Sequence, residues 1–161
     1  MDLMFLSVEI LQSGNSRAKI CAVETNNFTY LSGWNPTNVQ CPTVNLTTHR
    51  KDSYHSQNVP LFSVGDLNKD GSLDVVYGSA GVVYIYNSNG ILTNSIPIVD
   101  YEPWIRTIPI LADVDDDNSD LEIIVSSYSN TSHLSKIYAF KMDGTLVSGF
   151  PLSIPIEIKN S

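Results

Sequence analysis

The 161-residue sequence predicts an all-β fold assembled from repeated four-stranded antiparallel units, and three features support that prediction. Short apolar runs alternate with turns rich in Gly, Asn and Asp. No segment has the spacing of apolar residues that an amphipathic helix requires. The same order of segments returns at intervals of roughly 40–50 residues. Repeats of this length, with four short strands each, indicate blades of a partial β-propeller rather than a sandwich.

Three copies of the unit align without gaps in their main strand. Each copy has an apolar residue, a carboxylate, two aliphatic residues and small residues at the exit. A second strand and a Ser-Gly-aromatic segment recur further on. We therefore expect about two full blades and one partial blade. The main strand lies at residues 8–14, 73–79 and 121–127 with the carboxylates Glu9, Asp74 and Glu122, the second strand at 19–22 and 136–139, and the aromatic segment at 32–34 and 148–150.

These copies divide the chain into four expected stretches. The first is a partial N-terminal blade with strands near residues 8–14, 19–24 and 28–31, and a long polar connection without clear periodicity follows it. Two blades then complete the chain, each with an acidic loop after its first strand. The four stretches are residues 1–35, 36–59, 60–105 and 106–161.

Composition and charge limit the classes of partner. With 42% hydrophobic and 16% charged residues, the sequence is that of a globular chain. Its formal charge of −8, with only nine Lys and Arg residues, argues against nucleic acid and anionic membranes as partners. No apolar run reaches the roughly 18 residues of a membrane span. The apolar start carries Asp2 and Glu9 instead of a basic segment, so any secretion signal is expected outside this chain.

Cysteines and glycosylation motifs give weaker indications. Cys21 and Cys41 allow one disulfide without requiring it, and a buried thiol at Cys21 is an equal alternative. Three Asn-X-Ser/Thr triplets, at Asn27, Asn45 and Asn130, are weak hints of a secreted glycoprotein.

The loop at residues 65–74 has the composition of a site for a hard cation. Oxygen-bearing side chains stand at alternate positions, a glycine permits a sharp turn, and a carboxylate occupies the ninth position counted from Asp66. Calcium takes six to eight oxygen ligands at about 2.3–2.6 Å, and an alternating acidic loop can direct several of them to one point. An isolated Asp-Gly turn is usually only solvated, but here all the features coincide and favour metal. The residues that provide these features are Asp66, Asn68, Asp70, Gly71 and Asp74.

A second acidic loop, at residues 113–122, keeps the alternation with one departure. Asn118 takes the glycine position, and one extra residue precedes Glu122. Because Asn tolerates the left-handed conformation, the turn can survive. Strand register favours Glu122 as the terminal ligand and leaves Asp120 as the rival. The alternating carboxylates are Asp113, Asp115 and Asp117.

The run FSVGDLNKDG at residues 62–71, followed by LDVV and by VYIYNSNG at 83–90, resembles the FG-GAP/VCBS repeat of integrin-alpha-like β-propellers. The third copy, ending in DGTLVSGFP, is similar to the same repeat. An EF-hand fits less well, because it needs a Glu where Tyr77 stands and helices where this chain has strands. The resemblance implies calcium bound between the first two strands of each blade. It implies side-chain ligands at Asp66, Asn68, Asp70, Asp74, Asp113, Asp115, Asp117 and Glu122, and backbone carbonyls at Ser72 and Ser119. The first copy lacks an acidic loop, so no site is expected there.

Function follows less directly from the residues than architecture does. The leading expectation is a calcium-stabilised propeller segment for protein or glycan recognition or cell adhesion, in an extracellular or cell-surface protein. The remaining blades would come from a longer chain or by self-association. The alternatives are the propeller part of a secreted carbohydrate-active enzyme, such as a polysaccharide lyase, and an inactive gene fragment. The loop that could touch a glycan contains Tyr101, Glu102, Trp104 and Arg106, although core packing is the more common role for such an aromatic residue.

Overall fold

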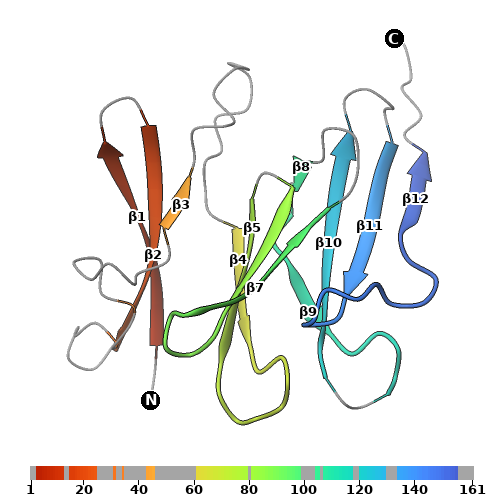
Figure 1. The fold of residues 1–161 in the computed structure, drawn as a ribbon, viewed down its shortest axis with the longest axis horizontal. Coiled ribbons are helices and arrows are strands. Elements are labelled where there is room, and N and C mark those ends of the chain that lie inside the picture. The colour runs from red at the N-terminus through yellow and green to blue at the C-terminus, as the bar shows by residue number, and fades with distance from the viewer. Residues whose placement is uncertain are drawn as a thin grey trace. The chain divides into compact units, whose positions relative to one another are not determined.

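The computed structural model describes residues 3–12, 15–24, 31, 34, 43–45, 61–79, 81–98, 104–105, 107–117, 120–129 and 134–155. Within these residues the chain is all-β, with three antiparallel sheets and no helix that could cross a membrane (Figure 1). The contacts divide the chain into two compact units, Met1–Pro60 with Tyr86–Thr93, and Leu61–Ile85 with Asn94–Ser161. The predicted all-β class is confirmed.

The first sheet contains β1 (Leu3–Gln12), β2 (Asn15–Glu24) and β3 (Thr43–Asn45), in the order β1-β2-β3. Residues 21–23 of β2 are buried. In the same unit, the buried Trp34 donates its indole N–H to the Ser88 carbonyl at 2.7 Å and packs edge-on against Tyr86.

Three features of this region bear on the expected strands. Strand β3 lies inside the stretch 36–59, which was expected to be a long polar connection without clear periodicity. Residue 31, at the end of the expected strand 28–31, is not in a strand, and residues 28–30 are outside the described part. The register also differs from the aligned copies: Cys21 pairs with Leu6, whereas the alignment with the third copy would place Gln12 opposite it. The reason is that the whole of β1 pairs with β2, from Leu3 opposite Glu24 to Gln12 opposite Asn15.

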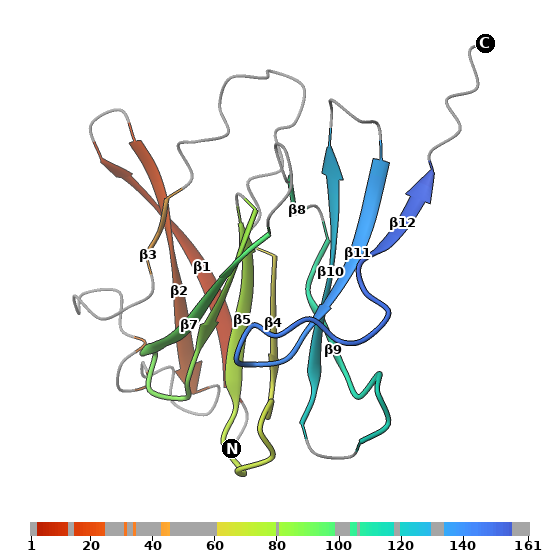
Figure 2. The same cartoon turned by 45° about the vertical axis from the view of Figure 1, so that its right-hand side comes forward.

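The second sheet is a four-stranded meander in sequence order. It contains β4 (Leu61–Gly65), β5 (Asp74–Ser79), β6 (Val82–Tyr86) and β7 (Leu92–Pro97). The second strand, β5, is buried over residues 74–78 on both faces, as its run of apolar residues indicates. Figure 2 shows the long loop that joins β4 to β5 at one end of this sheet.

The third sheet has the order β12-β11-β10-β8, and β9 also pairs with β10. Its strands are β8 (Trp104–Ile105), β9 (Ile110–Ala112), β10 (Glu122–Ser129), β11 (Leu134–Phe140) and β12 (Leu152–Pro155). Strands β8 and β9 pair with successive parts of one edge of β10, at Ser127–Tyr128 and at residues 122–124. They therefore act as one interrupted strand, and the sheet has four strand positions, as predicted.

One apolar core joins the second and third sheets. Most of its side chains come from β5, β6 and β7 on one sheet and from β10 and β11 on the other, and Leu67 and Ile98 lie beside these strands. Tyr138 and Phe140 stack within it, with ring centroids 5.6 Å apart. The two sheets do not close into a ring within the described residues. The buried members of the core are Leu67, Val76, Val83, Ile85, Ile96, Ile98, Ile123, Val125, Tyr138 and Phe140.

Candidate metal centre

The two acidic loops occupy equivalent places in the two four-stranded sheets. The first connects β4 to β5, and the strand pair before it ends at Gly65 opposite Asp74. The second connects β9 to β10, where Ala112 is opposite Glu122. Strand register thus makes Glu122, and not Asp120, the counterpart of Asp74.

Backbone conformation and hydrogen bonds support this equivalence. The fourth residue of each loop, counted from Asp66 and from Asp113, is left-handed, with φ of 55° at both Lys69 and Asp116. The Asp74 carboxylate accepts the N–H of Leu67 at 3.2 Å. In the second loop, Glu122 Oε2 accepts the N–H of Val114 at 2.8 Å. Each terminal carboxylate therefore closes its loop by accepting the N–H of the loop's second residue, and the extra residue of the second loop is accommodated elsewhere.

In the first loop the backbone winds around the side-chain oxygens. Asp66 accepts the N–H groups of Asp70 at 2.9 Å and of Gly71 at 2.8 Å. Asp70 in turn accepts the N–H of Ser72 at 2.7 Å and the Asn68 amide at 2.9 Å. Gly71 has φ of 86°, a conformation that favours glycine. The loop is thus preorganised by its own acceptors.

The two carboxyls of this loop with shifted pKa values have opposite environments. Burial raises the pKa of Asp74, which is only 5% exposed, and the negative charges of Asp70 and Asp66 raise it further. The Asn68 amide and the Ser72 N–H lower the pKa of the exposed Asp70. Asp74 is therefore a buried acceptor whose negative charge is not fully compensated by the groups around it.

The second loop brings three carboxylates together. One oxygen from each of Asp113, Asp115 and Glu122 lies within 4.8 Å of the others. Among the described residues, this is the group of acidic side chains close enough to share a metal ion. Asp66, Asp70 and Asp74 of the first loop are not gathered as closely.

Glu122 supplies the sharpest feature of this cluster. The residue is fully buried, and its Oε1 has no hydrogen-bond partner in the described part of the chain. A buried carboxylate without compensation is costly. A hard cation would supply the missing interaction, and carboxylate oxygens are its preferred ligands. The residues therefore fit a hard metal cation.

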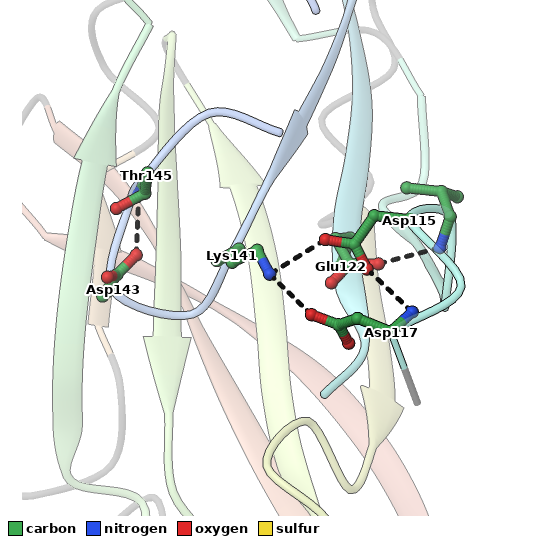
Figure 3. A network of polar contacts seen from close by, with 7 residues as sticks. Asp115, Asp117, Glu122, Lys141, Asp143 and Thr145 are labelled. Atoms are coloured by element: carbon green, nitrogen blue, oxygen red, sulfur yellow. Dashed lines mark hydrogen bonds and ion pairs between the residues drawn. The ribbon is translucent and has the colours of Figure 1, made fainter. Parts of the chain in front are cut away.

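A lysine that the sequence reasoning did not identify lies at the outer side of the cluster. Lys141, just after β11, places Nζ 2.9 Å from Asp115 Oδ2 and 2.9 Å from Asp117 Oδ2. Figure 3 shows its side chain directed at both carboxylates, with Glu122 beside Asp115. The hydrogen bonds to Asp115 and then to Asp117 raise the pKa of Lys141 above its ordinary value. Asp117, one of the expected metal ligands, thus contacts this lysine.

The two loops also contact each other through the backbone. The Leu121 N–H, one residue before Glu122, donates to the Leu67 carbonyl at 2.8 Å. Leu67 is fully buried and belongs to the apolar core. The loops are therefore fixed to the same core.

Some predicted site residues cannot be placed. Ser119, Tyr101, Glu102 and Arg106 lie outside the described residues, as does Cys41. The backbone of Trp104 is in β8 opposite Tyr128, and its side chain is outside the described part. Cys21 is buried in β2.

A cavity of about 540 Å³ lies between β7 and the segment formed by β11 and the turn after it. Charged groups of both signs, Lys136 and Asp143, contribute to its lining together with the exposed Leu146. None of its lining residues belongs to either acidic loop.

Comparisons of the chain with protein-family models, with curated proteins and with solved structures found no match.

Proposed function

We propose that this chain is a calcium-binding β-propeller segment of the FG-GAP/VCBS type, which serves recognition of a protein or a glycan in a secreted or cell-surface protein. The observation that carries the calcium function is the buried Glu122, whose Oε1 lacks a partner among the described residues and lies beside Asp113 and Asp115. The same position in the neighbouring sheet holds the buried Asp74.

Calcium has a structural role in this proposal. In the second loop, Asp113, Asp115 and Glu122 would hold the ion. In the first loop, Asp66, Asn68, Asp70 and Asp74 would supply side-chain oxygens and Ser72 a carbonyl. The ion would neutralise carboxylates that repel one another and would fix the connection between the first two strands of each blade.

The packing of the two sheets supports a radial arrangement. The first strands of the two sheets pack closely, because a Cβ added at Gly65 would lie 2.8 Å from Leu111 Cδ1. Next to it, the Ser63 hydroxyl donates to the Pro109 carbonyl. The last strand of the second sheet, β7, borders the 540 Å³ cavity and also contacts the third sheet, because Ile96 belongs to the shared core and the Asn94 amide donates to the Met142 carbonyl at 2.9 Å. Two four-stranded antiparallel sheets that pack against each other through one core would suit neighbouring blades of a propeller.

Exposed apolar side chains on the third sheet agree with a propeller whose ring of blades is not closed by the described sheets alone. Ile110 on β9 and Leu152 and Ile154 on the edge strand β12 are all more than 40% exposed. An uncovered apolar edge is an aggregation hazard. Further blades, from a longer chain or from a second copy, would cover these residues.

The expected affinity suits the extracellular space. Sites in extracellular modules bind calcium with dissociation constants of roughly 10⁻⁴–10⁻³ M. At a free calcium concentration of about ten times the dissociation constant, each site adds about 1.4 kcal/mol to the free energy of unfolding. For a chain of this size, that corresponds to a rise in Tm of roughly 3–6 °C per site.

Thermal unfolding in EGTA and in millimolar calcium tests this function. The parent chain should melt several degrees higher in calcium, and Asp70→Ala should lose part of this increment, because it removes a first-loop ligand. An equal Tm in EGTA and calcium would reject the proposal. The alternative of a carbohydrate-active enzyme depends on residues around Tyr101 that lie outside the described part, and no observation favours it.

A further inference from the structure

Lys141 pairs with two partly exposed carboxylates of the second acidic loop and leaves the buried Glu122 Oε1 without a partner among the described residues. Its Nζ is 2.9 Å from one oxygen each of Asp115 and Asp117. These pairs are partly exposed, with side-chain exposures of 24–38%. Glu122 Oε1, at the buried end, still has no hydrogen-bond partner among the described residues. The lysine therefore compensates only the outer part of the acidic cluster.

The turn that carries Lys141 does not itself need a lysine. The Lys141 N–H donates to the Thr145 carbonyl at 2.8 Å, and the Gly144 N–H donates back to the Lys141 carbonyl at 2.9 Å. The turn after β6 has the same two bonds, from Asn87 to the Ile91 carbonyl at 2.9 Å and from Gly90 to the Asn87 carbonyl at 2.8 Å. The equivalent residue in that turn is the neutral Asn87.

We propose that Lys141 is an internal cation that competes with calcium for the carboxylates of the second loop and so sets its affinity. This inference rests on the proposed calcium function. Asp115 belongs both to the lysine pair and to the three-carboxylate cluster, so an ion bound there would face the ammonium group across one shared carboxylate. Two positive charges on either side of one carboxylate repel each other strongly where water is partly excluded. Calcium binding must therefore displace the lysine or be weakened by it.

The test uses the 161-residue chain in an Asp70→Ala background, so that calorimetric titration with calcium reports the second loop. Lys141→Asn introduces the residue of the equivalent turn and removes the charge, Lys141→Arg keeps the charge, and Lys136→Met removes a lysine from β11 as the control for net charge. We expect Lys141→Asn to bind calcium about tenfold more tightly than its background, a fold-change within the range of one removed charge contact. The other two variants should stay within about twofold of the background.

Thermal unfolding gives a second readout that a purely structural lysine would not produce. Lys141→Asn should melt below the background in EGTA, because the carboxylates lose their counter-ion, and should gain more from calcium than the background does. An unchanged or weaker calcium affinity, or an equal loss of Tm in both conditions, would overturn the inference. If Lys141→Asn binds no calcium while the chain with Asp70 intact does, the inference fails and the calcium function stands on the first loop. If neither binds calcium, both proposals fail.

Discussion

Replacement of Glu122 by Gln should change stability in opposite directions without and with calcium. Glutamine has the same shape, so its amide oxygen can still accept the Val114 N–H that Glu122 Oε2 accepts at 2.8 Å. The amide NH₂ takes the place of Oε1, the buried atom without a partner in the described part of the chain. The substitution removes a buried negative charge. It also supplies a hydrogen-bond donor near Asp113 and Asp115, each of which has an oxygen within 4.8 Å of the Glu122 carboxylate.

The magnitude follows from the cost of the unsatisfied atom. A buried polar group without a partner costs about 1–3 kcal/mol. In EGTA, Glu122→Gln should therefore raise the free energy of unfolding by about 1–3 kcal/mol, which corresponds to a rise of roughly 2–4 °C in Tm per kcal/mol. In calcium the variant should lose the second-loop increment of about 1.4 kcal/mol at ten times the dissociation constant.

Urea unfolding of the parent and the variant, each in EGTA and in calcium, measures both effects. Asp143→Asn is the matched control, because Asp143 is exposed and accepts the Thr145 N–H within its own turn at 2.8 Å, outside both loops. Its calcium increment should equal that of the parent. If Glu122→Gln destabilises the metal-free chain by more than about 1 kcal/mol, or keeps the full calcium increment, the reasoning about Oε1 is wrong.

Substitutions at three further positions test other parts of the structure. Asp74→Asn should raise Tm in EGTA at pH 7, because a carboxyl whose pKa is raised by folding lowers stability at pH values above its unfolded pKa of 3.8. The gain in Tm should vanish as the pH falls below 3.8. A gain that does not depend on pH would refute this cause. Gly78→Val should cost about 1–3 kcal/mol in urea unfolding, because an added Cβ lies 2.9 Å from Ile105 Cγ2, and a neutral result would contradict close packing of the sheets there. Gly71→Ala should cost about 1–2 kcal/mol by the same assay through the φ of 86° alone, since no atom lies within 4 Å of an added Cβ. Gly71→Asn should cost less, because Asn tolerates the left-handed conformation better than Ala. The reverse order would contradict backbone strain as the cause.

The local features of the fold were predictable because they depend on residues close in sequence. Alternating oxygen-bearing side chains, a left-handed position and a following apolar strand identify each acidic loop without its surroundings. Strand register also favoured Glu122 over Asp120, and the observed pairing of Glu122 with Ala112 has the same register as that of Asp74 with Gly65. The meander order follows from short connections between consecutive strands.

Features that depend on distant contacts were not predictable from the same patterns. Lys141 is 24 positions beyond Asp117, and only the pairing of β10 with β11 brings its turn to the loop. A lysine beside an Asp-Gly turn has no signal of its own. The first sheet shows the same limit, because a shared pattern of apolar and small residues does not fix which residues pair. Strand β3, three residues long, is too short for any periodicity to reveal.

Calorimetric counting of bound calcium tests the central claim most directly. The parent chain should bind two calcium ions, Asp70→Ala should retain only the second-loop site, and Glu122→Gln should retain only the first-loop site. Failure of the parent to bind calcium at millimolar concentration, or undiminished stoichiometry in both variants, would contradict the assignment of the two acidic loops as calcium sites.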